Sequence, residues 1–300
     1  MNQHAAQRRF IAVFLAPALL LFTVFVALPA ARAILYSFQK WDGLTPATWA
    51  GLDNFQKLFG NSDLFRAALG HNLILLVGAG SLTMVLALAF AAMLHRRIRG
   101  AALFRVAFFF PNVIASVAVA LLWILLYSTT GFGVINGFLA ALQSVFPALP
   151  LELPIPFFDS KNVIYSMIPM IVWTSTGFYM VLFLAGMEGI PEEYYEAAEL
   201  DGASPLAQFF HITLPMIREV LTIGLVFMVI SILKFFDPIW VVENQRPGKD
   251  AHVLSTLLYQ KTFSEYHIGE GAAVAVLQFL LVFAATLVSL RLSRRDRLEF

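Results

Sequence analysis

Polar side chains interrupt two long apolar runs in the second half of the chain. In the run from 163 to 187 an indole is followed by several hydroxyl groups: Trp173, Thr174, Ser175, Thr176 and Tyr179. Together these groups could stack on a hydroxylated solute and hydrogen-bond to it. The competing interpretation is helix–helix packing through small polar residues, which is common inside membranes.

The run from 220 to 242 carries two charged residues. Ser231, Lys234 and Asp237 are spaced three apart, so one continuous helix would place them along one face. A charged side chain at mid-bilayer costs roughly 2.5–3.5 kcal/mol, so each needs a reason to be there. Either they line a translocation path, or Lys234 and Asp237 form an ion pair that neutralises itself near the end of the run. Weaker candidates for the same path lie in other runs: Asn112, Ser116 and Gln278.

The motifs of catalysis are missing from the chain. There is no G-x-x-x-x-G-K-[ST] phosphate loop, because the isolated Gly248-Lys249 lacks the preceding glycine. There is no H-E-x-x-H or G-x-S-x-G motif, cysteine is absent, and the histidines show no metal spacing. We therefore expect no catalytic residue, no metal site and no cofactor bound by this chain, which argues against an intramembrane enzyme. The formal net charge of +1 gives no indication of nucleic-acid binding.

Composition indicates an integral membrane protein. Of the 300 residues, 59% are hydrophobic and 13% are charged, whereas a soluble domain has about 45–50% and about 25%. Six apolar runs are long enough to cross a bilayer, which takes about 20 helical residues. We predict an all-α integral membrane fold in one domain over residues 1–300, with six spans near 10–31, 72–94, 101–127, 163–187, 220–242 and 268–290.

The first run has two interpretations. Arg8 and Arg9, an apolar core and Ala31-Arg32-Ala33 resemble a cleavable signal peptide. The run is long for the core of such a peptide and five further spans follow it, so we favour an uncleaved anchor.

Orientation follows from lysine and arginine in short loops, which favour the cytoplasmic side. Arginines cluster beside span ends on the face that carries both termini: Arg8, Arg9, Arg96, Arg97, Arg99, Arg105, Arg218, Arg291, Arg294, Arg295 and Arg297. Both termini are therefore predicted to be cytoplasmic. On the opposite side, the connection 128–162 contains glycines and prolines and is interpreted as an irregular cap over a cavity.

Residues 188–218 form an acidic passage on the predicted cytoplasmic side. Pro191 suits the first position of a helix, Gly202 a left-handed helix end, and Ser204-Pro205 the start of a second short helix. Ala197 and Ala198 keep one patch of the first helix thin, so another protein can approach its backbone closely. An elaborate loop on this side is where an energy-supplying partner would dock.

The same passage carries a sequence signature. It consists of Glu196-Ala197-Ala198, three residues, Gly202, nine residues, Ile212, one residue and Leu214-Pro215. This pattern resembles the EAA signature of membrane permeases of bacterial binding-protein-dependent ABC importers. The longer form, which includes Asp201 and Ala203, is similar to the branch that handles carbohydrates. Shorter matches occur in the family's order: Tyr36-Ser37-Phe38, Gly51-Leu52-Asp53-Asn54-Phe55, Phe109-Phe110-Pro111, Gly133-Val134-Ile135-Asn136 and Phe236-Asp237.

The resemblance implies the ABC importer permease fold, a set of partners and a location. A second homologous permease subunit completes the pathway in the lipid bilayer of the bacterial cytoplasmic (inner) membrane. A dimer of a cytoplasmic ABC ATPase uses ATP and Mg²⁺ beneath it, and an extracytoplasmic solute-binding protein delivers the solute. In this family the EAA region is a coupling helix that lodges in a cleft of the ATPase, so that ATPase closure turns the pathway outward. The implied coupling residues are Glu196, Ala197, Ala198, Asp201, Gly202, Ala203, Ile212, Leu214 and Pro215.

Solute contacts of the family lie on the helices that flank the EAA loop, which points to Thr174, Ser175, Ser231 and Lys234. The sequence does not select among sugars, oligosaccharides, polyols and glycerol phosphates as the solute. The sugar branch often carries a threonine-rich GGP segment after the fifth span, and residues 243–250 retain only one glycine of that pattern. The alternative is an ion-coupled secondary transporter, with internal repeats, broken helices and buried acids; no repeat is visible and Asp237 is the one candidate acid. A structural membrane scaffold would have no use for the signature.

Overall fold

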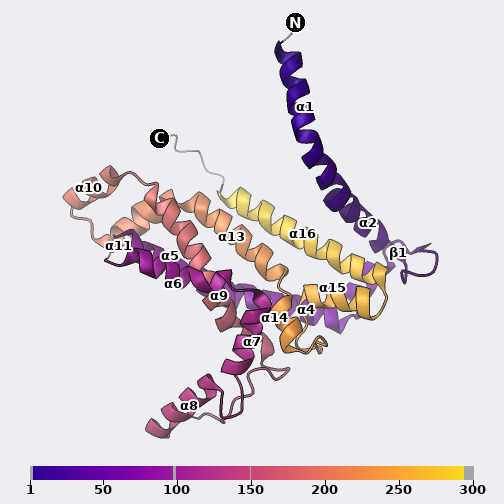
Figure 1. The fold of residues 1–300 in the computed structure, drawn as a ribbon. Coiled ribbons are helices and arrows are strands. Elements are labelled where there is room, and N and C mark those ends of the chain that lie inside the picture. The colour runs from indigo at the N-terminus through magenta and orange to yellow at the C-terminus, as the bar shows by residue number, and fades with distance from the viewer. Residues whose placement is uncertain (1–2, 97–98, 149, 294–300) are drawn as a thin grey trace. The chain divides into compact units, whose positions relative to one another are not determined.

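The computed structural model describes residues 3–96, 99–148 and 150–293, and it is almost entirely helical (Figure 1). Contacts divide the chain into two compact units. Unit 1 contains Met1–Ser62 and Leu257–Phe279, and unit 2 contains Asp63–Thr256 and Leu280–Phe300. The single domain over residues 1–300 stays a prediction. Four arginines of the orientation argument lie outside the described residues: Arg97, Arg294, Arg295 and Arg297.

Unit 1 contains a long apolar helical stretch and a small hairpin. Its elements are α1 (Gln3–Phe22), the π-helical turn η1 (Thr23–Ala27), α2 (Leu28–Ser37), β1 (Gln39–Lys40), β2 (Thr48–Trp49), α3 (Asp53–Asn61), the π-helical turn η4 (Gln260–Ser264) and the start of α16 (Ile268–Ser293). The antiparallel strands pair Gln39 with Trp49. The buried Asn54 fastens this hairpin, because its Nδ2 donates to the carbonyl oxygens of Ser37 and Gln39, both at 2.9 Å. No residue from 10 to 36 is buried, and all of them except the half-buried Ala33 and Tyr36 are exposed.

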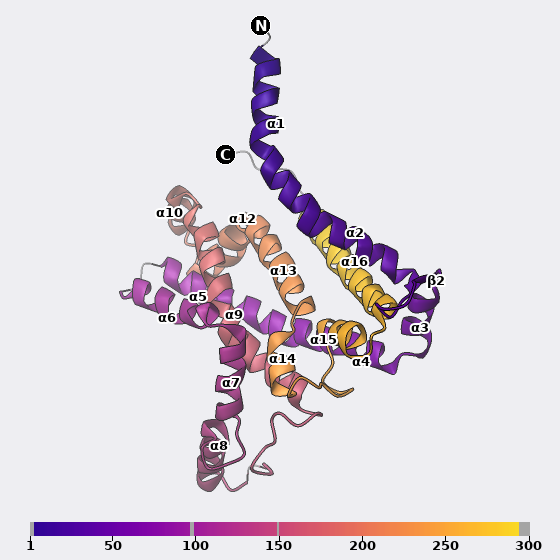
Figure 2. The ribbon, with the colours of Figure 1, turned by 45° about the vertical axis from the view of Figure 1, so that its right-hand side comes forward.

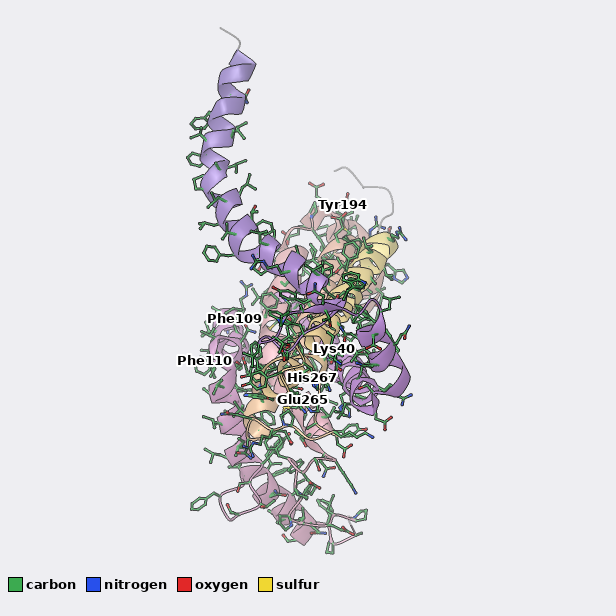
Figure 3. The ribbon with its side chains drawn as sticks, turned by 90° about the vertical axis from the view of Figure 1, so that its right-hand side faces the viewer. Lys40, Phe109, Phe110, Tyr194, Glu265 and His267 are labelled. Atoms are coloured by element: carbon green, nitrogen blue, oxygen red, sulfur yellow. The ribbon has the colours of Figure 1, made fainter. Side chains whose placement is uncertain are left out.

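An ionic cluster joins η4 to the start of α16 within unit 1. Lys261 Nζ lies 2.7 Å from Glu265 Oε2 and 3.3 Å from Glu270 Oε2. Figure 3 shows Glu265 and His267 close together, and His267 Nδ1 is 3.5 Å from Glu265 Oε2. Burial of Lys261 acts to lower its pKa, but the hydrogen bond and charge of Glu265, together with Glu270, outweigh burial and raise the pKa above its ordinary value. Burial likewise acts to raise the pKa of Glu265, and hydrogen bonds from Lys261 and Gln260 reverse the effect and lower it.

Unit 2 contains the remaining helices. They are α4 (Asp63–Leu75), the π-helical turn η2 (Leu76–Gly80), α5 (Ser81–His95), α6 (Ala101–Val113), α7 (Ser116–Leu126), α8 (Val134–Val145), α9 (Val163–Glu188), α10 (Glu192–Leu200), α11 (Pro205–Gln208), the π-helical turn η3 (Phe209–Thr213), α12 (Leu214–Met216), α13 (Arg218–Leu233) and α14 (Asp237–Val242). A further helix, α15 (Leu254–Tyr259), crosses the division between the units.

The core of unit 2 is built around α9, which packs against α5, α6 and α13. Its large side chains Met167, Met180 and Phe183 are completely enclosed. Gly177 lets α6 cross closely, because a Cβ atom at this position would lie 1.9 Å from the carbonyl oxygen of Phe108. No side chain fits at such a distance, so glycine is required here.

Five helices of the described chain are long and apolar enough to cross a membrane: Phe10–Ser37, Asp63–His95, Val163–Glu188, Arg218–Val242 and Ile268–Arg291. The third predicted span, 101–127, differs from the expected straight helix. Its two halves, α6 and α7, meet at 97° and form a sixth span only if the bent pair is counted as one (Figure 2). Pro111 lacks an N–H and weakens the last turn of α6, and Ile114 and Ala115 then adopt extended backbone angles.

The fifth span is also interrupted, which corrects the prediction that Lys234 and Asp237 share one helical face. Helix α13 ends at Leu233, and α14 starts at Asp237. In a continuous helix, the ring of Pro238 would clash with the carbonyl of Lys234, and its missing N–H would leave that carbonyl unpaired. The break between the two helices therefore follows from Pro238.

The connection 128–162 is more regular than the irregular cap expected from its composition, because it contains the helix α8. The buried Asn136 ties this helix to its surroundings. Its Nδ2 donates to the carbonyl oxygens of Ser128 and Ile155, both at 3.1 Å, and its Oδ1 accepts from the N–H of Ile155 at 2.8 Å. One amide thus fastens both ends of the connection to α8.

Candidate functional site

Residues 188–218, here called the coupling stretch, form the predicted pair of short helices, α10 and α11. Figure 1 shows them at the end of unit 2 opposite to α8. Gly202 has φ of 76°, its N–H donates to the carbonyl of Glu199, and the N–H of Ala203 donates to that of Ala198. These two bonds make the Schellman motif that ends α10. Pro191 precedes the helix as its N-cap, so α10 begins one residue later than predicted.

The start of α11 agrees with the sequence expectation. Ser204 is its N-cap and accepts a hydrogen bond of 3.3 Å from the N–H of Ala207, with Pro205 at the first helical position. Gln208 Nε2 then donates to the carbonyl oxygen of Ala203 at 3.3 Å, which closes the corner between the two helices.

A hydrogen bond within the coupling stretch joins Tyr195 on α10 to Thr213 on η3, and the ring of Tyr195 anchors the stretch beside His95 on α5. Their hydroxyl groups lie 2.9 Å apart, and the Tyr195 ring lies beside His95 with ring centroids 5.7 Å apart. Helical backbone continues from η3 through α12 to α13, because Ile217 N–H donates to Thr213 and Leu221 N–H donates to Ile217. This anchor was missed at the sequence level, since nothing local marks a tyrosine as the partner of a threonine 18 residues away.

The outward side of the coupling stretch is open. Among the signature residues, five are exposed and four are half-buried; the exposed ones are Glu196, Ala197, Asp201, Gly202 and Pro215, and the half-buried ones are Ala198, Ala203, Ile212 and Leu214. Leu200 at the end of α10 is 90% exposed. Within the described chain, Glu193, Glu196 and Glu199 form no ion pair. An acidic surface with a thin alanine patch and one projecting leucine is thus left without an intramolecular partner.

A cleft of about 1120 Å³ lies beside the coupling stretch. The end of α5, the start of α6 and η3 line it, with His95, Arg96 and Arg105 as its basic residues. Across the cleft, Arg105 Nη2 lies 2.8 Å from Glu188 Oε1, which joins α6 to the start of the coupling stretch. The two residues are 83 positions apart, so sequence reasoning used Arg105 only for orientation and did not predict the pair.

The polar side chains of α9 differ in their exposure and in the groups that they contact. The hydroxyl of Thr174 donates to the carbonyl oxygens of Met170 and Ile171, at 2.9 and 3.1 Å, so it is bound within its own helix. Ser175 is half-buried, and the ring of Trp173 is 39% exposed with its edge toward Trp123, centroids 6.2 Å apart. The side chain of the buried Tyr179 lies close to that of Ser231 on α13. The structure therefore brings together one predicted pair, Tyr179 and Ser231.

The remaining predicted pathway residues lie near the two helix breaks. Asn112 is exposed at the end of α6, and Lys234 is exposed at the C-terminal end of α13. Asp237 accepts a hydrogen bond of 2.5 Å from Ser116 Oγ and forms no ion pair with Lys234 among the described residues. The self-neutralising pair considered for Lys234 and Asp237 is therefore absent from the described chain.

No group of three or more histidine, aspartate or glutamate side chains in the described ranges is arranged to hold a metal ion. The predicted pathway residues offer hydroxyl, amide and indole groups with one lysine, Lys234, and one aspartate, Asp237. Such groups can hydrogen-bond to a polar solute.

These helices and breaks define a multi-pass membrane protein, and comparison with known proteins identifies its class. Residues 83–295 match the family described as "Binding-protein-dependent transport system inner membrane component". The chain belongs to this family, and its fold is that of an ABC importer permease.

Individual relatives match over most of their length. The chain is 32% identical to the diacetylchitobiose uptake system permease protein NgcF of Streptomyces coelicolor, covering 92% of this chain and 80% of the relative. It is 30% identical to the trehalose/maltose transport system permease protein MalF of Thermococcus litoralis, covering 94% and 92%. A crystal structure of a bacterial ABC transporter involved in the import of the acidic polysaccharide alginate contains a chain with a TM-score of 0.82 at 23% identity, covering 98% of both chains, which supports the fold.

Proposed function

We propose that this chain is the transmembrane permease subunit of an ATP-driven importer that moves a carbohydrate-type solute across the bacterial inner membrane. The solute class is a sugar, oligosaccharide, polyol or glycerol phosphate. Family membership supports the transport role, and relatives named for diacetylchitobiose and for trehalose and maltose support the solute class. The chain itself is not an enzyme in this proposal, and binds no cofactor.

The observation that carries the proposal is the coupling stretch. Glu193, Glu196 and Glu199 on its outward face form no ion pair within the described chain. On its inner side, Tyr195 packs beside His95 of α5 and bonds to Thr213, from which helical backbone continues into α13. In the proposal, α10 docks into a dimer of a cytoplasmic ATPase that uses ATP and Mg²⁺. Closure of that dimer pushes α10, and the helical backbone of η3 and α12 passes the movement to α13.

The proposed solute path follows from the polar residues on the moving helices. Tyr179 and Ser231 link α9 to α13, and Ser116 and Asp237 link the two helix breaks. Movement of α13 therefore changes both links at once. Trp173, Ser175, Asn112 and Lys234 complete the set of side chains proposed to meet the solute, whereas Thr174 has its hydroxyl proton engaged by its own helix.

The remaining partners follow from the same proposal. A second homologous permease subunit supplies the other half of the path, and an extracytoplasmic solute-binding protein delivers the solute. A solved relative of the same fold is described in complex with an alginate pentasaccharide-bound periplasmic protein. In the proposal both termini and the coupling stretch lie in the cytoplasm, which the arginines near the span ends support.

One observation favours the second candidate, an ion-coupled secondary transporter. Two broken spans meet at a carboxylate, Asp237, as such transporters often show. Family membership favours the ATP-driven importer instead.

Uptake by the complete complex in proteoliposomes separates the two candidates. The ATP-driven importer accumulates labelled solute when ATP and the binding protein are supplied, and a protonophore leaves accumulation unchanged. Uptake that needs a proton or sodium gradient and ignores ATP would overturn the proposal.

A further inference from the structure

Helix α8 presents three different faces, which follow from the 100° turn per residue of an α-helix. The first face consists of the exposed apolar side chains Val134, Phe138 and Val145, with Ala141 between them. The second contains Ile135, Asn136, Leu139 and Gln143, which are buried or half-buried. The third consists of the small exposed residues Gly137, Ala140 and Ser144. Phe138 is 66% exposed, so the apolar face is not covered by the described part of the chain.

The polar groups of α8 are already satisfied by the chain's own backbone. Asn136 bonds to the carbonyls of Ser128 and Ile155, and Gln143 Nε2 donates to the carbonyl oxygen of Leu151 at 2.9 Å. Ser144 Oγ donates to the carbonyl oxygen of Ala141 at 2.7 Å. The apolar face thus provides apolar contact area but no side chain that could hydrogen-bond to a partner. The centre of a protein interface differs, because tyrosine, tryptophan and arginine predominate there.

The sequence around α8 also lacks charge. No aspartate, glutamate, lysine or arginine occurs from Ser128 to Leu151, and Phe132 and Phe146 flank the helix with exposed rings. A loop bathed in water on all sides would not normally leave so long a stretch uncharged. The helix also lies close to the bilayer by connection, because α7 before it belongs to the bent span pair.

We infer that α8 lies in the lipid–water interface of the leaflet opposite to the coupling stretch, with Val134, Phe138 and Val145 in contact with acyl chains. An interfacial helix buries its apolar face between headgroups and acyl chains and keeps the opposite side toward water or protein. Here the small face of Ala140 and Ser144 meets the water, and the second face meets residues 128–155 of the chain. The helix then holds the outer end of α7 at a fixed depth while the coupling stretch moves at the other end of unit 2.

The absence of cysteine makes a direct test possible, because a single introduced cysteine carries the only label. Phe138→Cys and the matched variant Ser144→Cys, both exposed and on the same helix, are labelled with a nitroxide. The complete importer is reconstituted in vesicles of phosphatidylethanolamine and phosphatidylglycerol. Collision rates with oxygen, which concentrates in lipid, and with a water-soluble nickel chelate are then measured by electron paramagnetic resonance.

If the apolar face contacts lipid, the label at position 138 collides more often with oxygen than with the chelate. The label at position 144 then collides more often with the chelate than with oxygen. Equal access of the chelate to both positions would place α8 in water and overturn the inference. A label at position 138 that is shielded from both reagents would show that another protein covers the face, which also overturns it. Because the readout is structural, it is independent of whether the transported solute is a carbohydrate.

Discussion

Ser116 Oγ donates a hydrogen bond of 2.5 Å to Asp237 Oδ2, and this bond connects the first turns of α7 and α14. Each of these helices begins directly after a break in a span, so the two breaks are joined to each other. The positive N-terminal ends of helices also favour a carboxylate at this place. We propose that a movement of α13 reaches the bend between α6 and α7 through Asp237.

The first prediction concerns this bond. A hydrogen bond to a charged group contributes about 1.5–3 kcal/mol, so Ser116→Ala and Asp237→Ala should each slow solute uptake roughly tenfold or more. Because the two variants remove one shared interaction, the double variant should be little slower than either single one. Initial uptake rates in proteoliposomes measure the effect. Ser144→Ala, a serine on α8 that bonds to its own helix, is the control and should leave the rate unchanged; additive losses in the double variant would contradict the link.

A second prediction concerns the corner of the coupling stretch. Gly202 has φ of 76°, and a Cβ atom there would meet nothing within 4 Å, so Gly202→Asp causes backbone strain without a clash. The left-handed conformation costs an L-residue roughly 1–2 kcal/mol. This strain should reorient α10 and abolish ATP-driven uptake while the protein still inserts in the membrane.

The matched control for this corner is Gly51→Asp. Gly51 also has positive φ, 56°, and open surroundings, but it lies before α3 in unit 1. The Gly51→Asp variant should retain solute uptake when the amount of protein inserted in the membrane equals that of Gly202→Asp. Normal uptake by Gly202→Asp would show that the corner plays no part in coupling.

The third prediction tests the packing of α6 on α9. In Gly177→Ala the new methyl group would lie 1.9 Å from Phe108 O and 2.7 Å from Phe109 Cα, so the α6 backbone has to move. Overpacking of this kind costs about 1–3 kcal/mol, and the melting temperature of the purified complex should fall. Gly70→Ala on α4, with nothing within 4 Å of the added methyl group, should raise stability slightly, since alanine favours a helix by about 0.5–1 kcal/mol over glycine. Equal melting temperatures for the two variants would refute the close crossing.

The fourth prediction concerns pH and the ionic cluster of Lys261. The pKa of Glu265 is lowered, so its contribution is present above the ordinary value of 4.5 and is lost as pH falls through the lower folded-state pKa. The pKa of Lys261 is raised, so its contribution is present below the ordinary value of 10.5 and is lost as pH rises through the higher folded-state pKa. The stability contributed by the Lys261–Glu265 pair itself should therefore be constant between about pH 5 and about pH 10.

Lys261→Met should lower the melting temperature at pH 7, because it leaves the partly buried Glu265 without its cation. The difference from the unchanged protein should shrink as pH falls below about 4.5 and on through the lowered pKa of Glu265, where this carboxylate becomes protonated. Arg66→Met is the control, since Arg66 pairs with Asp63 at the surface and outside this cluster, where such pairs contribute little to stability. A difference between Lys261→Met and the unchanged protein that is the same at pH 4 and pH 7 would exclude an ionic origin.

Local chemistry accounts for what was predictable from the sequence. Apolar runs of bilayer length located the spans, and the Gly202 and Ser204-Pro205 pattern located the ends of α10 and α11, since capping depends on a few neighbouring residues.

Features that depend on a proline, on the carbonyls of a residue's own helix or on contacts between distant segments were missed by pattern reasoning. The spacing of Lys234 and Asp237 suggested one face because the effect of Pro238 on the preceding turn was not considered. Thr174 was chosen for its hydroxyl, but the nearest acceptors of that hydroxyl are carbonyls of its own helix. The pairs Arg105–Glu188 and Tyr195–Thr213 join distant segments and carry no local signal.

The central claim is that α10 contacts the ATPase, and photo-crosslinking tests it most directly. A benzophenone is attached to Ala197→Cys, which is the only cysteine and lies on the exposed face of α10, and the complete importer is irradiated with and without ATP. Ala140→Cys on α8, at the opposite end of unit 2, is the control. The account predicts crosslinks from position 197 to the ATPase subunit and none from position 140. Crosslinks from position 197 only to lipid, or to no protein at all, would contradict it.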